Sequence, residues 1–531
     1  LGLSVVVAEK EPLVGGTTAW SGGWMWIPRN PLAVAAGIDD PLDEVRRYLR
    51  NVIGAQYDEA RLEMFLAHAP AMVEFHLQHT ALRFVDGNAV PDFHGRLPGA
   101  RTGGRSVCAA PFDASVLGAE LRRLRPPRDI LAFLGMSIGG DLRHFLRAGR
   151  AWESLRYAAG RVLRHGAQCL RHGQGTTRMA GNALAAALFK SALDAGVRVF
   201  TSHPVTALVT ERGRVVGARL GTPQGEREVR AARGVVLAAG GFPHDGQRQQ
   251  RLFAHAPHWS AAPLSNTGDG LRLGEAVGAQ VDASGAEPGA WAPVSLVLRP
   301  DGSLTHFPHL IERGKPGLIA VDRDGRRFVD EAGNYHSFMR ALFDRAARQH
   351  PGQPVEAWLV CDHRFQRRFG LGHSKPWPLP IAGSLRSGYL KRASTLPELA
   401  RACGIAPQGL AATVAAFNQQ ARAGRDPEYQ RGETAYDRMQ GDAEHGGPNP
   451  CVAPIEHAPY YAVRVVPGSG VTMARSSLSR RLNSDDLPAL GGPVSVTVTP
   501  ARTSRLRSPR RRAAARSAAQ QVKRSAHAAA A

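Results

Sequence analysis

The chain has few cysteines, and no two of them form a C-x-x-C pair. The five cysteines stand far apart in the sequence, at Cys108, Cys169, Cys361, Cys403 and Cys451. This spacing excludes the common zinc, iron–sulfur and c-type haem motifs, so we predict no metal centre. Scattered thiols are typical of a reducing compartment, and we therefore expect a cytoplasmic protein.

Long apolar segments are also missing. No run reaches the roughly 18 apolar residues that a membrane span requires. A hydrophobic fraction of 43% predicts a globular protein instead. Because 531 residues exceed one compact core, we expect at least two domains.

Acidic residues are outnumbered, with 45 Asp and Glu against 67 Lys and Arg and a net charge of +22. Part of this excess lies in residues 471–531, which hold twelve Lys and Arg, two Asp and no aromatic residue. Such a segment cannot bury enough apolar area to offset its ordering entropy, so we predict a disordered, basic, low-complexity tail. A nucleic-acid-binding arm is the less favoured interpretation, and we predict no nucleic-acid partner.

The first residues indicate a nucleotide-binding sheet. Leu3 to Ala8 is a short apolar run rich in β-branched residues, and it predicts a buried parallel strand. In dinucleotide-binding folds an acidic residue at the end of the second strand binds the adenosine ribose, and Glu9 stands at that place. For these ten residues taken alone, a strand that ends in a solvated Glu-Lys pair is the simpler interpretation.

Glycine is concentrated in three further segments. "GGTTAWSGG", Gly15 to Gly23, suits a backbone that approaches a phosphate or a flat ring. Gly234 to Ala238 predicts a buried strand that runs into glycines, and "NTGDG", Asn266 to Gly270, predicts a helix start where anions bind readily. Between them, "VTALVTERGRVVGARL" predicts a hairpin that turns at Glu211 to Arg214. Each segment alone is weak evidence for a nucleotide-binding fold, but their order along the chain is strong evidence for it.

Five blocks of sequence carry a resemblance to a known family. They are "VVVAEKEPLVGGTTAWSGG", "VVLAAGGF", "NTGDGLRLGEAVGA", "GRRFVDEAGNYHSFM" and "GYLKRASTLPELA". From residue 1 to about residue 468 the chain resembles the FAD-dependent flavoproteins of the fumarate reductase/succinate dehydrogenase superfamily. Within that superfamily it is most similar to the 3-ketosteroid Δ1-dehydrogenase branch.

The resemblance implies an α/β fold with FAD as the cofactor. It implies a Rossmann-like FAD-binding domain with a three-layer, mostly parallel sheet in residues 1–284, an inserted α+β catalytic cap in 285–455, and a return to the FAD domain in 456–470. The residues that it implies for FAD binding are Glu9, Gly15, Gly16, Thr17, Thr18, Ser21, Gly22, Gly23, Val205, Ala239, Gly240, Gly241, Asn266, Gly268 and Asp269.

The chemistry of this branch selects the candidate catalytic residues. Desaturating a ketone next to its carbonyl requires loss of a proton from the α-carbon and of a hydride from the β-carbon to the flavin. A base and a donor that polarises the carbonyl are therefore needed. The resemblance places the family's catalytic tyrosine at Tyr335, with His336 beside it as an assistant. The alternatives are a core tyrosine and a surface histidine.

A second family tyrosine falls where this chain has Phe93-His94. Phe93 cannot donate a proton, so His94 is the candidate substitute. Two other family elements are not found: the first G-x-G-x-x-G turn, and a C-terminal Tyr-x-G-x-G element, because the family pattern stops at Ser469. We interpret these absences as a 5′ truncation and a 3′ frameshift, and we expect the chain as written to bind FAD weakly and to be inactive.

Three functions compete. The favoured one is an FAD-dependent oxidoreductase acting on CH–CH groups, which desaturates a bulky, apolar, 3-ketosteroid-like ketone and passes electrons to an unidentified acceptor. The second is an enzyme similar to fumarate or urocanate reductases that acts on a small unsaturated acid, for which Arg313, Arg340 and Arg386 are loose candidates. The third is an inactive remnant or a basic interaction protein.

Residues 141–166 have helical spacing, with Leu, Phe, Trp and Tyr among arginines. This pattern suits peripheral contact with the inner face of a membrane, which an apolar substrate would favour. It also suits a solvated pair of helices packed on the FAD domain, which is the simpler interpretation.

Overall fold

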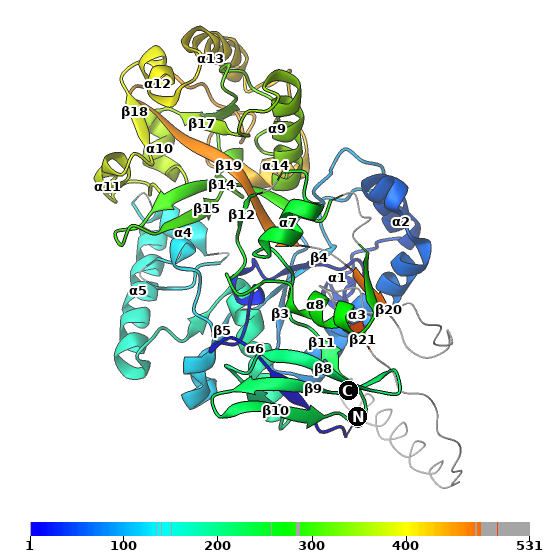
Figure 1. Ribbon diagram of the computed structural model, residues 1–531. Helices are drawn as coiled ribbons and strands as arrows, with labels where there is room; N and C mark the ends of the chain where they lie inside the picture. The colour runs from blue at the N-terminus through cyan, green and yellow to red at the C-terminus, as the bar shows by residue number, and fades with distance from the viewer. Residues whose placement is uncertain are drawn as a thin grey trace, which may run out of the picture.

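The computed structural model describes residues 2–472 except 134, 140, 150, 256 and 283–286, together with the backbone of 475–478 and 496–497. Helices and sheets are mixed along the chain, so the fold class is α/β, as predicted (Figure 1). Among the described residues, no helix combines the length and the apolar character that crossing a bilayer requires. All five cysteines are free thiols.

The nucleotide-binding part begins with β1 (Val6–Ala8), which pairs in parallel with β7 (Arg198–Phe200). Helix α6 (Ala180–Asp194) immediately precedes β7, and its alanine-rich sequence favours a helix. β8 (Val205–Glu211), β9 (Arg214–Thr222) and β10 (Gly225–Arg230) form an antiparallel sheet. The predicted hairpin is confirmed, because Glu211 pairs with Arg214.

Two predicted buried strands are shorter and more exposed than expected. β1 starts at Val6, and Leu3, Val5 and Val7 are exposed. In the described part of the chain β1 has one neighbouring strand, β7, so its other edge has no strand beside it. β11 (Val236–Leu237) replaces the strand expected over 234–238, and Val236 is 67% exposed because only Leu237 packs inward.

The cap contains a seven-stranded sheet built around one long strand. The order is β15-β14-β19-β17-β16, with β12 and β18 also paired to β19. The first half of β19 pairs with β17 and β18, and its second half pairs with β14 and β12, so β19 runs from the upper part of the molecule to its middle (Figure 1). The bounds are β12 (Trp259–Ser260), β14 (Gly289–Leu298), β15 (Leu304–Pro308), β16 (Leu318–Val321), β17 (Ala357–Cys361), β18 (Lys391–Ala393) and β19 (Tyr460–Thr472).

Helices cover both faces of this sheet. Alternate residues of β16 and β17 point to opposite sides. Leu318 and Leu359 pack with α9 (Tyr335–Gln349), whereas Ile319 and Val360 pack with α12 (Leu396–Cys403) and α13 (Pro407–Ala421). The cap therefore has a hydrophobic core on each side of the sheet.

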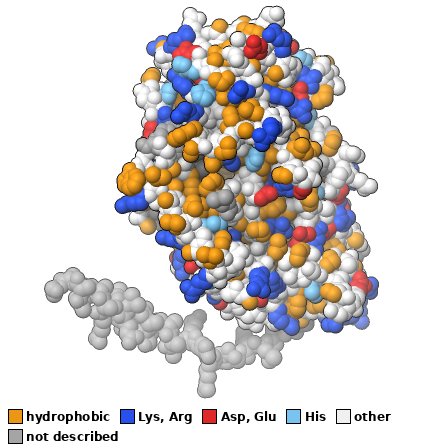
Figure 2. Space-filling model, turned by 90° about the vertical axis from the view of Figure 1, so that its left-hand side faces the viewer, with side chains coloured by type: hydrophobic (Ala, Val, Ile, Leu, Met, Phe, Trp, Pro, Cys, Tyr) orange, Lys and Arg blue, Asp and Glu red, His pale blue; other side chains and the backbone are white. Residues whose placement is uncertain are grey.

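The other helices surround these sheets. Helices α4 and α5 lie on the left in Figure 1, the side that faces the viewer in Figure 2. The helices are α1 (Pro31–Ala35), α2 (Leu42–Ile53), α3 (Glu59–His79), α4 (Leu142–Arg147), α5 (Trp152–His172), α7 (Gly246–Leu252), α8 (Asp269–Ala276), α10 (His363–Phe369), α11 (Ala382–Arg386) and α14 (Ala435–Gln440). The 3₁₀ helices are η1 (Thr18–Trp20), η2 (Gly54–Gln56), η3 (Ala114–Arg123), η4 (Asp129–Leu131) and η5 (Glu312–Gly314).

Short strands complete the description. They are β2 (Trp24–Trp26), β3 (Phe84–Asp86), β4 (Ser106–Ala109), β5 (Phe112–Asp113), β6 (Thr177–Arg178), β13 (Ala279–Asp282), β20 (Arg475–Leu478) and β21 (Val496–Thr497). β20 and β21 belong to the tail predicted to be disordered. β20 pairs with β13, and β21 pairs with β11. The rest of 479–531 lies outside the described residues.

The predicted domain limit at 284/285 also lies outside the described residues, so the domain limits stay a prediction.

A buried ion-pair network fixes the loop 92–101, which carries Phe93 and His94. Arg105 donates to both carboxylate oxygens of Asp40, at 2.9 and 2.7 Å, and to Asp92 Oδ2 at 2.8 Å. Asp92 also accepts the backbone N–H of Arg101, while its own N–H donates to the carbonyl of Arg101. These bonds close the loop at both ends.

Replacement of Arg105 by Ala is expected to destabilise the protein strongly. It would remove the buried counter-charge that bonds to both Asp40 and Asp92, at a cost of about 3–5 kcal/mol in the free energy of unfolding. Arg101→Ala is the matched control, because Arg101 is partly exposed and lies 3.6 Å from Asp40; its effect should stay under about 1 kcal/mol. Urea denaturation measures both, and equal losses would contradict the assignment.

Candidate active site

The segments predicted to bind FAD meet at the ends of β1 and β11. Glu9 follows β1, and its N–H donates to the carbonyl of Phe200 in β7. Lys10 donates to Thr267 Oγ1 at 3.0 Å and forms an ion pair with Asp269 at the start of α8. Asn266 Nδ2 donates to Thr17 Oγ1 at 2.6 Å. Side chains about 250 residues apart in sequence thus bring the glycine-rich loop against the N-terminus of α8.

The glycines of this region have distinct roles. Gly23 has a φ of +70°, and a Cβ there would lie 2.5 Å from the carbonyl carbon of Ala180, so Gly23 permits close packing against α6. Gly16 has a φ of +48°, and nothing lies within 4 Å of the position that a Cβ would take. The backbone at Gly16 therefore borders open space that a ligand could fill. Gly240, with a φ of +76°, lies against Asn266.

The electrostatics at Glu9 suit a ribose. Burial raises the pKa of Glu9, while the N–H of Glu11, which donates to Glu9 Oε1 at 2.9 Å, and the charge of Arg125 oppose this shift. One carboxylate oxygen thus has a fixed donor, and the other is available to accept from a sugar hydroxyl. These residues fit FAD, and when bound it would be held by the loop 15–23, Glu9 and the start of α8.

The remaining predicted cofactor residues lie in or beside these segments. Ser21 accepts the N–H of Gly181 through its carbonyl, and Gly22 accepts from Cys108 Sγ. The Gly268 N–H donates to the carbonyl of Gly241. Val205 packs with Leu237 and Leu273. Contact of each residue with FAD stays a prediction, as it does for Thr18, Gly15 and Ala239.

Tyr335 is the first residue of α9. Asn334 caps this helix, its Oδ1 accepting the N–H of Ser337 at 2.9 Å. Burial raises the pKa of Tyr335, and its hydroxyl has no hydrogen-bond partner among the described residues. The positive end of the helix dipole favours an anion at this position. The hydroxyl is therefore left for a ligand, while burial disfavours its ionised form.

Phe93 lies beside Tyr335, as the resemblance implied for the second family tyrosine. The two ring centroids are 6.0 Å apart, with the rings edge to face. Tyr436, in the first turn of α14, completes this aromatic group, with its ring 4.9 Å from Phe93. The sequence analysis missed Tyr436, because one tyrosine in a short helix has no local signal that separates it from a core residue. Burial raises its pKa to about 12, and its hydroxyl accepts from Gln440.

Both candidate histidines are neutral at ordinary pH. Burial lowers the pKa of His336 and of His94. The N–H of Trp291 donates to His336 Nδ1 at 3.2 Å, so the proton of the neutral imidazole is on Nε2. The backbone N–H of His94 donates to the hydroxyl of Tyr48. Nε2 of His336 thus has no hydrogen-bond partner in the described part of the chain, and the roles of His336 and His94 both stay predictions.

A cavity of about 320 Å³ opens near Phe93 and Tyr436, between residues 91–102 and the start of α14. Arg96, Arg101 and Glu433 line it together with Thr434. Tyr335 does not line it, so this cavity is not the place where the reacting carbons would lie.

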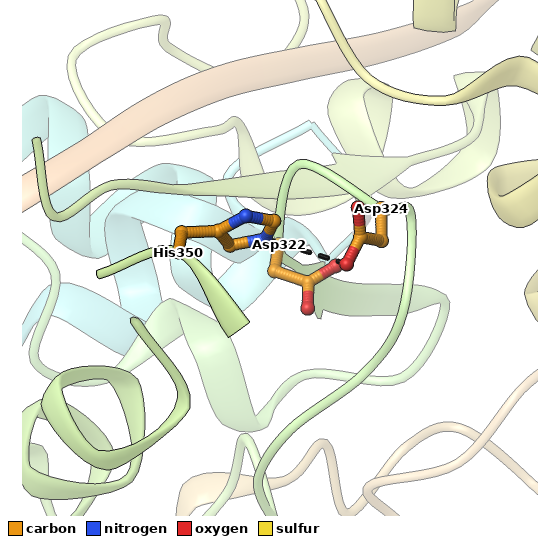
Figure 3. Close-up of side chains that lie close together, drawn as sticks. All are labelled: Asp322, Asp324 and His350. Carbon is orange, nitrogen blue, oxygen red and sulfur yellow. Dashed lines mark ion pairs between the residues drawn. The ribbon is translucent and has the colours of Figure 1, made fainter. Parts of the chain in front are cut away.

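Three possible metal ligands gather elsewhere in the cap. Asp322, Asp324 and His350 place one ligand atom each within 4.8 Å of the others (Figure 3). His350 Nε2 forms an ion pair with Asp324 at 3.3 Å, and Arg345 Nε donates to Asp322 Oδ2 at 2.6 Å. Because these ion pairs account for the cluster, we assign it no role, and the absence of a metal centre stays a prediction.

Comparisons with known proteins identify the family of the chain. The model of the FAD binding domain family matches residues 1–474. The chain is 38% identical to 4-oxocyclohex-2-ene-1-carboxylate 5-dehydrogenase of Sinomonas cyclohexanicum, over 89% of this chain and 80% of the relative. It is 34% identical to 3-oxosteroid 1-dehydrogenase of Mycolicibacterium smegmatis, over 92% of this chain and 86% of the relative.

A solved structure is similar over most of its length. The 3-ketosteroid Δ1-dehydrogenase from Sterolibacterium denitrificans, in complex with 1,4-androstadiene-3,17-dione, superposes with a TM-score of 0.82 at 33% identity. The match covers 93% of this chain and 89% of that chain.

The fold and the site define a flavoprotein that binds FAD. The chain belongs to the FAD binding domain family, in the group that contains the 3-oxosteroid 1-dehydrogenases. It is an FAD-dependent oxidoreductase of the class that acts on CH–CH groups. The resemblance predicted from the sequence is confirmed, and the family match extends a few residues past Ser469, where the pattern was expected to stop.

Replacement of Gly16 by Ala is expected to weaken FAD binding. The new methyl group would enter the open space at the loop, so the dissociation constant should rise by about tenfold or more, which equals about 1.4 kcal/mol. Gly37→Ala is the matched control, since Gly37 has a φ of +74° and similarly open surroundings next to α1. It carries the same backbone strain without facing the cofactor segments.

Titration of the apo-protein with FAD, followed by flavin fluorescence, measures both variants. Equal loss of affinity in the two would show that strain, and not the position of the cofactor, caused the effect.

Proposed function

We propose that the protein desaturates a ring ketone next to its carbonyl, with Tyr335 as the base that takes the α-proton. The observation that carries this proposal is the position of Tyr335 at the start of α9 with its ring beside Phe93, and its hydroxyl has no hydrogen-bond partner within the described part of the chain. The relatives support it, because their names describe oxidation of an oxocyclohexene acid and of 3-oxosteroids. Ring ketones are the chemistry common to both.

In this proposal each residue has a separate task. FAD, when bound, supplies the acceptor for the hydride that leaves the β-carbon. The Tyr335 phenolate, a minor species because burial raises the pKa of this phenol, removes the α-proton. The Nε2 proton of His336 is a donor for the ketone oxygen. Phe93 and Tyr436 give Tyr335 an apolar wall, which suits a bulky apolar substrate such as a steroid.

The arginine candidates give the reductase alternative little support. Arg313 is 1% exposed, and its three nitrogens donate to the carbonyls of His309, Glu331 and Gly333. Its burial and these three bonds hold it inside the protein, which makes it a poor candidate for contact with a substrate. Arg340 and Arg386 are exposed on α9 and α11. These findings favour a ring ketone over a small unsaturated acid as the substrate.

The electron acceptor is not identified by these observations. Peripheral contact with the inner face of a membrane, predicted from residues 141–166, stays a proposal, as does a location in the cytoplasm.

Tyr335→Phe is expected to lower kcat by about 10²-fold or more, because a positioned acid–base group contributes that much. FAD binding should be unchanged. The measurement is turnover of a saturated 3-oxosteroid with an artificial electron acceptor. Tyr436→Phe is the control, since its hydroxyl already accepts from Gln440, and it should keep most of the activity. A Tyr335→Phe variant as active as the parent would refute the role of the base.

The rate of flavin reduction should rise with pH. The pKa of Tyr335 is raised above the ordinary value of 10, so the phenolate is a minor species at neutral pH. Its fraction increases about tenfold per pH unit between about pH 7 and 9. Anaerobic stopped-flow measurements should therefore give a logarithmic slope near one over that range. The slope should vanish in Tyr335→Phe, and a flat profile in the parent protein would contradict the proposal.

A further inference from the structure

Helix α5 presents a continuous apolar stripe to solvent. Trp152, Leu155, Leu163 and Leu170 are exposed by 77, 44, 75 and 92%. With Ala159 and Gly166 they follow a spacing of three and four residues, which places them on one side of a helix. The stripe extends over about 27 Å. Exposed leucines occur singly on many proteins, but a row of this length on one helix is an interaction surface.

The opposite face of α5 is fixed to the protein. Arg161 donates to Asp141 Oδ2 at 3.1 Å and to the carbonyl of Ser137, and the hydroxyl of Tyr157 donates to the same carboxylate. Gln168 accepts the N–H of Thr176. The helix therefore cannot rotate to bury its stripe without breaking these buried bonds. The orientation of the stripe is set by the fold.

Positive charge lies along one edge of the stripe. Arg156, Arg164 and Arg171 are exposed, and no carboxylate pairs with them in the described part of the chain. Glu153 is the one acidic residue of α5. Next to the start of α5, Trp377 is 55% exposed and lies against Gly149, where a Cβ would be 3.0 Å from its ring. Figure 2 looks onto this side, where apolar side chains gather with blue basic groups among them.

We propose that α5 is an interfacial helix that docks the protein on a bilayer containing anionic lipids. Its stripe enters the boundary between headgroups and acyl chains, Trp152 lies at the headgroup level, and the arginines bind lipid phosphates. A second copy of the chain is the poorer occupant. A two-fold contact through α5 would bring the same unpaired arginines of both copies together, where like charges repel.

Sedimentation of the full chain with vesicles tests this proposal without any need for turnover. Vesicles of phosphatidylcholine with phosphatidylglycerol should bind the protein, and phosphatidylcholine alone should bind it less. Leu163→Gln with Leu170→Gln should lower partitioning by at least about tenfold on both kinds of vesicle. Arg156→Gln with Arg164→Gln and Arg171→Gln should lower it only on anionic vesicles, with a loss that high salt reproduces in the parent protein.

Val34→Gln with Phe75→Gln is the matched control, because these exposed apolar residues lie on α1 and α3. It should bind vesicles like the parent protein, and circular dichroism should show all variants folded. Absence of vesicle binding, equal loss in the control, or a dimer in light scattering that Leu163→Gln with Leu170→Gln dissociates would each overturn the proposal. Failure here leaves the reaction proposed for Tyr335 unaffected, since that reaction is measured in solution.

Discussion

The carboxylate of Glu331 is fully buried in the cap, and the loop that carries Tyr335 is built around it. Arg327 and Arg431 donate to its two oxygens. Arg327 also donates to Asp426, so two arginines face two carboxylates. A buried carboxylate is costly unless it is paired and hydrogen-bonded in this way. Arg313 adds bonds to the backbone carbonyls of the same loop. Because α9 begins a few residues later, these ion pairs set the position of the phenol, whose own hydroxyl has no partner to orient it among the residues that the structure describes.

The opposite wall of the site depends on a second buried ionic group. Arg105, shared between Asp40 and Asp92, closes the loop that holds Phe93 against Tyr335. The two walls come from segments about 240 residues apart, and each is fixed by charges that would be costly to separate. This arrangement suits a base whose pKa lies above the working pH. A weakly populated phenolate reacts at a useful rate only when its distance to the carbon acid is held constant.

The parts of the candidate site that could be predicted from the sequence are those with a local sequence signal. Gly16, Gly23 and Gly240 lie in segments that could be selected as candidates because a backbone at positive φ, or one passing close to another chain segment, requires glycine. Glu9 could be selected as a candidate because it follows a short apolar run. The burial of the runs at Leu3 to Ala8 and Gly234 to Ala238 was predicted wrongly, because burial of a strand depends on its neighbours in the sheet, which the run itself does not encode.

The features that could not be predicted from the sequence depend on pairs of residues far apart in the chain. Glu331 and Arg431 are 100 residues apart, and no local pattern joins them. The orientation of helix α5 also could not be predicted from local sequence. In the sequence Arg161 and Arg164 look alike, yet Arg161 is buried against Asp141 while Arg164 faces solvent. Composition alone therefore left open whether the arginines of this helix face the protein or its surroundings. The ion pair between Arg161 and Asp141 sets the orientation of the helix. It fixes the rotation of α5 about its axis and thereby directs the apolar stripe outward.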